Sequence, residues 1–170
     1  MNTPKKICYI AMLTALYVVM SAFLKFYIGV GHIQVDLGYI AFSVALCMFG
    51  VYGAVVGVIG CAIESMLFTA YGFSISWVVA NAIIGVGCGL LFSKIKPFWG
   101  KAMVTVFFCA VGLLLAKTAI ECYLYSIPLA VKLPKSVAAF VVDAVVMVLG
   151  VVFYNILSAN ISKQRKGRED

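Results

Sequence analysis

Charged residues are scarce in this sequence. Only 11% of the 170 residues are charged, whereas a soluble domain averages about 25%. Hydrophobic residues make up 65% of the chain, and the mean hydropathy is +1.12. This composition excludes an ordinary soluble domain, because there are too few polar side chains to cover the surface of one. We therefore expect a membrane protein whose helices lie in lipid.

Residues that serve catalysis or metal binding are also scarce. The sequence has a single histidine and lacks the HExxH, GxSxG and P-loop patterns. A chain without a phosphate-binding loop cannot hydrolyse ATP by itself, so we expect no enzyme and no cofactor. The six cysteines form no CxxC pair and lie mostly within apolar runs. This pattern predicts small buried thiols rather than a metal or disulfide site.

The net charge of +7 does not indicate nucleic-acid binding, because the basic residues form no stripe on a soluble face. Nine of the thirteen lie in three clusters, at residues 5–6, 94–101 and 163–168, each at the end of an apolar run. If the chain crosses the membrane six times, all three clusters fall on one side. The positive-inside rule makes that side cytoplasmic.

The apolar runs predict an all-α membrane protein with six transmembrane helices and both termini in the cytoplasm. A spanning helix needs about 20 mostly apolar residues, so the length leaves no room for a separate soluble domain. Residues 1–170 then form a single transmembrane domain. The expected helices are residues 7–28, 37–49, 53–70, 75–92, 102–127 and 135–161, with loops at residues 29–36 and 128–134.

Residues 37–70 contain two apolar runs that meet at a Gly-Val-Tyr-Gly turn. The second run carries Gly53, Gly57 and Gly60, which allow another helix to approach closely. Glu64 follows one helical turn later. A thin helix face with a lone carboxylate predicts a polar site inside the membrane.

Ionisable and amide side chains recur at similar depth in the other expected helices. Asn81, Glu121 and Asp143 each lie about 10–12 Å from the outer end of their helix, and Lys117 about 16 Å. A charge at bilayer depth costs at least about 2.5–3.5 kcal/mol, so each needs a partner or a cavity. These residues and Glu64 are candidates for a substrate pocket open to the outside. Alternatively, Lys117 and Glu121 pair on one helix face, and the acids only join helices.

Further candidates lie near the same level. Tyr39, Tyr71, Trp77 and Tyr123 are able to stack on a flat ring, but the same aromatics also fit an interfacial belt. His32, Gln34 and Asp36 alternate in the first long loop, where they either line the mouth of the pocket or face solvent.

These motifs resemble the substrate-binding S components of energy-coupling factor (ECF) vitamin transporters, which are six-helix membrane proteins of about this length. The alanine-x3-alanine motif of their first helix is matched by Ala11 and Ala15 in IAMLTALYVV. Their second and third helices often read Phe-Gly-Pro, then Gly-Ala-x2-Gly-x2-Gly-Asp. Residues 49–61 read FGVYGAVVGVIGC, so Val51 replaces the proline and Cys61 replaces the aspartate. Glu64, one turn on, is a candidate to compensate for the missing aspartate.

The resemblance implies a multi-pass protein of the bacterial plasma membrane. It implies that Ala11 and Ala15 dock on a transmembrane scaffold subunit, and that two cytosolic ATPases power the complex. The chain itself would bind a vitamin or precursor from outside with high affinity, under a gate formed by the loop after the first helix. It would then reorient in the membrane to release this substrate inside.

Three acids and one lysine favour a ligand that is rich in N–H donors or carries an amine, and we favour the folate or pterin type or a queuosine precursor. Thiamine, pyridoxine-type vitamins, riboflavin, pantothenate and cobalamin stay open at this point. Two other classes also stay open: a structural or assembly protein of the membrane, and a stand-alone small-solute carrier or channel. A channel would need polar residues through the full membrane thickness, and the inner halves of the expected helices lack them.

Overall fold

The computed structural model describes residues 3–28, 33–68, 73–95 and 97–166. These residues are nearly all helical. The helices are α1 (Thr3–Phe23), α2 (Gly38–Phe49), η1 (Gly50–Gly53), α3 (Ala54–Phe68), α4 (Ile75–Phe92), α5 (Phe98–Cys109), η2 (Ala110–Lys117), α6 (Thr118–Tyr125) and α7 (Leu129–Lys166). Two short strands, β1 (Phe26–Ile28) and β2 (Ile33–Val35), form an antiparallel pair between α1 and α2.

Within the described ranges, five helical stretches are long and apolar enough to cross a membrane. They are Thr3–Phe23, Gly38–Phe68, Ile75–Phe92, Phe98–Tyr125 and Leu129–Ile161. The nearly all-helical membrane fold predicted from the sequence is confirmed. The second stretch contains both α2 and α3, for which the sequence predicts two separate helices.

The chain reverses direction between α2 and α3. Gly50 has a φ of 57°, a conformation that favours glycine. A Cβ atom on Gly53 would meet the backbone of Ala45, and one on Gly57 would meet the ring of Phe42. Later residues of α3 therefore face earlier residues of α2, so the two helices form an antiparallel hairpin.

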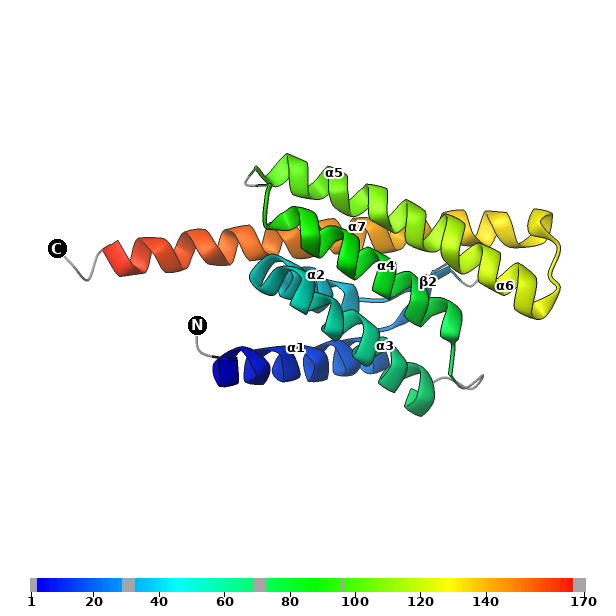
Figure 1. The fold of residues 1–170 in the computed structure, drawn as a ribbon, viewed down its shortest axis with the longest axis horizontal. Helices are drawn as coiled ribbons and strands as arrows, with labels where there is room; N and C mark the ends of the chain where they lie inside the picture. Colours follow the sequence, from blue (N-terminus) through cyan, green and yellow to red (C-terminus); the bar gives the residue numbers. More distant parts are fainter. Residues whose placement is uncertain (1–2, 29–32, 69–72, 96, 167–170) are drawn as a thin grey trace.

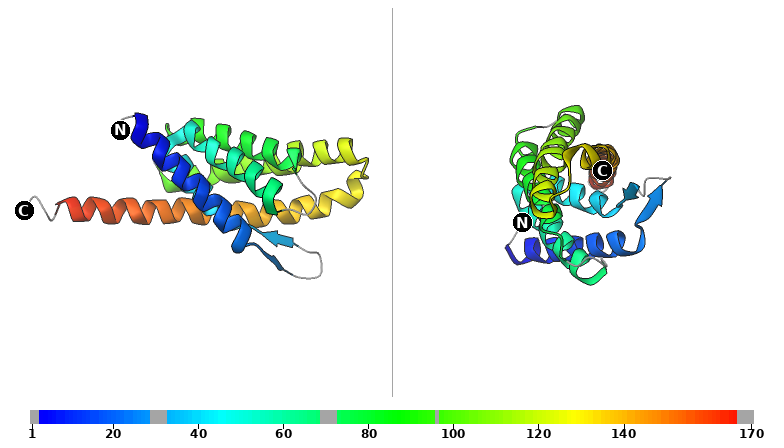
Figure 2. Two further views of the ribbon diagram at one scale, coloured as in Figure 1. Left: turned by 90° about the horizontal axis from the view of Figure 1, so that it is seen from below. Right: turned by 90° about the vertical axis from the view of Figure 1, so that its right-hand side faces the viewer.

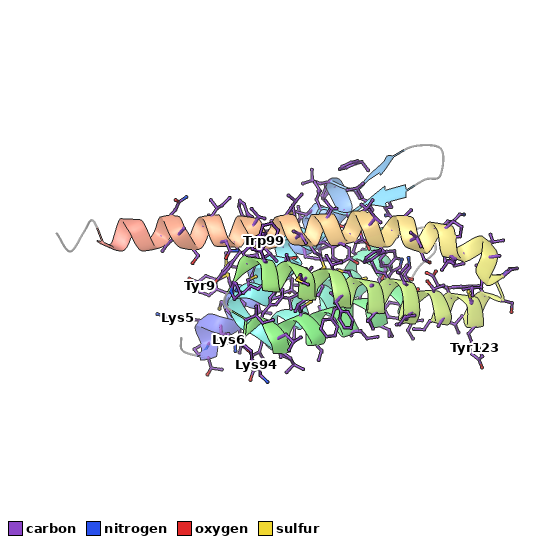
Figure 3. The ribbon with its side chains drawn as sticks, turned by 90° about the horizontal axis from the view of Figure 1, so that it is seen from above. Lys5, Lys6, Tyr9, Lys94, Trp99 and Tyr123 are labelled. Atoms are coloured by element: carbon purple, nitrogen blue, oxygen red, sulfur yellow. The ribbon has the colours of Figure 1, made fainter. Side chains whose placement is uncertain are left out.

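Most of the helices run along the long axis of the bundle (Figure 1), and α1 crosses α7 obliquely (Figure 2). The beginning of α1, the turn at η1 and the α4–α5 connection lie at one end of the bundle, here called the basic end because Lys5, Lys6 and Lys94 gather there (Figures 1 and 3). The last part of α7 extends past this end. The β1–β2 hairpin and the α6–α7 connection lie toward the opposite end, here called the polar end (Figure 2).

Several predicted helix bounds are wrong. The first helix ends at Phe23 instead of residue 28, because the chain turns into β1. The helix expected over residues 102–127 begins at Phe98, directly after the extended Pro97. The loop expected over residues 128–134 is helical: α7 begins at Leu129 and includes Pro134. Pro134 is the sixth residue of α7, so its nitrogen cannot donate to the Ala130 carbonyl, and the helix continues through it without that one backbone hydrogen bond.

Candidate substrate-binding site

The structure buries every ionisable or amide side chain that the sequence singled out within the helices. Glu64, Asn81, Lys117, Glu121 and Asp143 are all less than 9% exposed, and they come from α3, α4, η2, α6 and α7. A buried charge without a partner costs several kcal/mol. The partners of these groups therefore decide which of them are free to meet a ligand.

Glu64 is neutralised by Lys25, a residue that the sequence analysis did not single out. The Lys25 Nζ atom lies 2.6 Å from Glu64 Oε1 and 3.8 Å from Asp36 Oδ2. Ser21 Oγ and the Gly38 N–H both donate to Asp36 Oδ1, at 2.7 and 2.8 Å. Lys25 immediately precedes β1 and Asp36 immediately follows β2. Together with Glu64 they tie both ends of the hairpin to α3.

Burial raises the pKa of the Asp36 carboxyl above its usual 3.8. The Lys25 ammonium and the hydrogen bonds from Ser21 and Gly38 act in the opposite direction, and the negative charge of Glu64 adds to the rise. The single ammonium of Lys25 therefore serves two acids, of which Asp36 is the weaker partner by distance.

Glu121 is neutralised by a second lysine. Lys132 Nζ lies 2.5 Å from Glu121 Oε2, and Ser76 Oγ donates to Glu121 Oε1 at 3.1 Å. Lys132 reaches this position because α7 already begins at Leu129. The alternative in which Lys117 pairs with Glu121 is wrong. The Lys117 ammonium lies over the Trp77 ring, 3.5 Å from its centroid, in a cation–π contact.

A π-helical segment brings Lys117 and Thr118 into the interior. In η2 the backbone makes wide turns with i to i+5 spacing. Thr118 Oγ1 follows the same spacing and donates to the Leu113 carbonyl, five residues earlier, at 3.0 Å. The Thr118 hydroxyl also lies 2.8 Å from Ser136 Oγ on α7. Functional sites often contain such π segments, because they turn side chains that an ordinary helix would place elsewhere.

Tyr39, Asn81 and Asp143 lie at the centre of the group of buried polar side chains, here called the polar cluster. The Tyr39 hydroxyl donates to Asn81 Oδ1 at 3.0 Å, and the Asp143 carboxyl lies within electrostatic range of that hydroxyl. Asn81 Nδ2 and Asp143 Oδ2 are buried and have no hydrogen-bond partner among the described residues. Each such group costs about 1–3 kcal/mol or more. The centre therefore offers one free donor and one free acceptor.

Other candidates lie apart from this cluster or are not described. Tyr123 is 86% exposed at the polar end of the bundle (Figure 3), so the structure does not place it with the others. Gln34 lies on β2 between Ile33 and Val35, and Val35 is the residue buried there, so Gln34 faces away from the core. His32 and Tyr71 lie outside the described residues.

Comparisons with known proteins agree with this architecture. A family model described as "ECF-type riboflavin transporter, S component" matches residues 1–163. Among solved structures, the chain is similar to the S-component for biotin from an ECF-type ABC transporter. The TM-score is 0.68 at 17% sequence identity, over 94% of this chain and 95% of that chain, which shows a shared fold. No curated protein matches the chain. The resemblance seen in the sequence is confirmed, and the chain belongs to the family of ECF-type riboflavin transporter S components.

Proposed function

We propose that this chain is the high-affinity binding subunit through which an ECF-type transporter takes up a vitamin or vitamin-like precursor. The observation that carries the proposal is the buried polar cluster at one end of an S-component fold, in which Asn81 and Asp143 keep unpartnered atoms. Buried polar groups inside a membrane bundle are expensive and usually mark a substrate path. The chain supplies no ATPase activity of its own in this proposal.

The substrate in this proposal is a planar, nitrogen-rich ring. The sequence favours pterins, folates and queuosine precursors, and the family match adds flavins to the same chemical class. The ion pairs of Glu64 and Glu121 weaken the case for a ligand that carries an amine, because both acids already have a lysine partner. Tyr39 in the centre of the cluster and Trp77 beside Lys117 support a flat ring rather than a flexible chain.

We also propose six membrane crossings with both termini in the cytoplasm, so that the basic end faces the cytoplasm. The antiparallel hairpin of α2 and α3 supports this count. Lys5, Lys6 and Lys94 gather at the end where α1 begins (Figure 3), which fits the positive-inside rule. The polar cluster then faces the outside, beneath the β1–β2 hairpin, which serves as the gate.

Docking on the scaffold subunit is assigned to a groove on the lipid-facing side of α1 and α3. The groove has a volume of about 550 Å³ and an almost wholly apolar lining. Ala11 and Ala15 are among the α1 residues that line it, and α3 contributes Val55, Ile59 and Ile63. Small residues permit a partner helix to approach closely within lipid. In this proposal the scaffold subunit carries two cytosolic ATPases.

The proposal is tested with the purified full-length protein in detergent. Thermal unfolding is measured with riboflavin, biotin, folate, a queuosine precursor, thiamine and pantothenate at saturating concentration. We expect one planar heterocycle to raise the melting temperature, because a ligand that binds only the folded state stabilises it. If none of them shifts the melting temperature, the chain is not a subunit for these substrates.

Docking is tested separately by co-purification. Ala11→Leu/Ala15→Leu should abolish co-purification with the scaffold and ATPase subunits and leave ligand binding unchanged, because both alanines lie on α1, which contributes none of the five buried ionisable and amide groups. Leu115→Val, on the exposed side of η2, is the matched control. Intact co-purification of the double variant would exclude this groove as the docking surface.

A further inference from the structure

Two of the three buried acids within the described helices already have a lysine partner. This reduces the number of carboxylates that are available to a ligand. Lys25 pairs with Glu64, and Lys132 pairs with Glu121. Asp143 has no hydrogen-bond or ion-pair partner among the described residues at its Oδ2 atom, and its residue is only 2% exposed. The carboxylate that the bundle leaves available is therefore that of Asp143.

Asn81 supplies the matching donor. Its Oδ1 atom accepts the hydrogen bond of the Tyr39 hydroxyl, which fixes the orientation of the amide. The Nδ2 atom then points away from Tyr39, is fully buried and has no hydrogen-bond partner among the described residues. Its neighbour is the Cys61 thiol, a weak acceptor. Asn81 accepts the Tyr39 hydrogen bond and Asp143 lies within electrostatic range of the same hydroxyl, so the free donor and the free acceptor belong to one buried cluster.

Lys117 sets the charge of the same site. Its ammonium lies over the Trp77 ring and within electrostatic range of Asp143. Lys117 and Asp143 leave the centre without net charge when both are ionised and also when both are neutral. A cationic ligand would bring a positive charge close to Lys117, so the site disfavours it.

We infer that Asp143 and Asn81 together recognise the edge of a ring amide, in which an N–H group and a carbonyl lie side by side on an uncharged heterocycle. Asp143 accepts from the ring N–H, and Asn81 Nδ2 donates to the ring carbonyl. The two buried atoms without a partner, Asp143 Oδ2 and Asn81 Nδ2, then each form a hydrogen bond with the same ligand. The inference rests on the proposed function and adds to it the two residues that determine specificity and the edge that they read.

The experiment uses the purified full-length protein, with riboflavin, biotin, folate and thiamine as probes. Affinity is measured by calorimetry for the wild type, Asp143→Asn and Asn81→Leu. We expect a ring-amide vitamin to bind best, and each substitution to weaken its binding about 10- to 100-fold. If the vitamin is riboflavin, its N3-methyl derivative should bind at least about 100-fold more weakly, because a methyl group replaces the N–H that faces Asp143.

Asn155 provides a matched control on α7. Its Nδ2 atom is also buried without a partner among the described residues, but it lies 12 positions from Asp143, about 18 Å along the helix. Asn155→Leu should therefore leave affinity unchanged. Melting curves without ligand show that each variant is folded.

The outcomes separate the inference from the proposed function. Tightest binding of thiamine overturns the inference and leaves a vitamin-binding subunit in place. The inference is also overturned, and the proposed function kept, if a ring-amide vitamin binds with the same affinity to the wild type, Asp143→Asn and Asn81→Leu. Binding of none of the probes overturns both.

Discussion

The two ends of the bundle are held together by different interactions. At the basic end, glycines bring backbones into contact: Gly53 faces the backbone of Ala45, and Gly89 faces that of Val51. At the polar end, ion pairs join the elements: Lys25–Glu64 ties the β1–β2 hairpin to α3, and Lys132–Glu121 ties α7 to α6. In lipid, close packing is a main source of helix association, because there is no hydrophobic effect between helices. We infer that the glycine contacts stabilise the fold, whereas the polar end sacrifices stability for binding.

The largest expected effect is at the basic end. A Cβ atom on Gly53 would lie 2.5 Å from the Ala45 carbonyl oxygen, and a backbone atom cannot move aside as a side chain can. Gly53→Val should therefore lower the free energy of unfolding by about 3 kcal/mol or prevent folding. Thermal unfolding in detergent measures this, with Leu90→Val on the exposed side of α4 as control. Equal melting temperatures for both variants would contradict the assignment of stability to glycine contacts.

A smaller loss of stability is expected when the ion pairs that hold the β1–β2 hairpin to α3 are removed. Lys25→Gln leaves Glu64 and Asp36 without their shared cation, and Lys25 and Glu64 are mostly buried. We expect a loss of about 2 kcal/mol in stability, and faster release of bound ligand because the hairpin is no longer held to α3. Stopped-flow measurement of ligand release tests the second effect. Lys25→Met/Glu64→Leu should recover most of the stability but not the slow release. A release rate unchanged in Lys25→Gln would exclude the hairpin as a gate.

At the centre of the polar end, a substitution should preserve or raise the stability of the protein instead of lowering it. Asp143 Oδ2 has no partner among the described residues, so Asp143→Asn removes a buried charge. The ligand-free protein should be as stable as the wild type or more stable by about 1 kcal/mol, although binding is weakened. Melting without ligand measures this. A fall as large as that of Gly53→Val would mean that Asp143 supports the fold.

The smallest effect concerns pH. Burial raises the pKa of Asp36 in the folded protein, so the folded state binds this proton at a higher pH than the unfolded chain does. Above the pKa of the folded protein, the charged Asp36 carboxyl lowers the free energy of unfolding. This unfavourable contribution disappears as the pH falls through that pKa toward the usual 3.8. Compared with Asp36→Asn, the wild type should therefore gain relative stability as the pH is lowered. Melting curves of both proteins at several pH values test this, and a relative loss would contradict it.

The sequence predicts well those features that depend on local composition. The helix expected at residues 75–92 is α4 with the same bounds, because its apolar run is flanked by polar residues and a proline. The burial of Glu64, Asn81 and Asp143 follows from their position in apolar runs, which leaves the bundle interior as the only polar surroundings in lipid.

Features that depend on distant residues are not readable in this way. The Lys25–Glu64 pair joins positions 39 apart, and no spacing rule connects them. The strands β1 and β2 are three residues each, too short for alternation to reveal them. Lys117 and Glu121 have the spacing of a helical pair, but tertiary contacts with Trp77 and Lys132 override it.

The π-helical segment η2 has a consequence for the evolution of the chain. A residue inserted into an α-helix shifts everything after it by about 100° around the axis, and a wide turn absorbs that shift locally. Deleting one residue from Ala110–Lys117 would therefore restore a regular α-helix and leave Thr118 and Glu121 facing the interior. Homologous chains that lack this extra residue should therefore carry the same inward polar groups one position earlier in their sequence, so an alignment without a gap in this segment would match the wrong side chains.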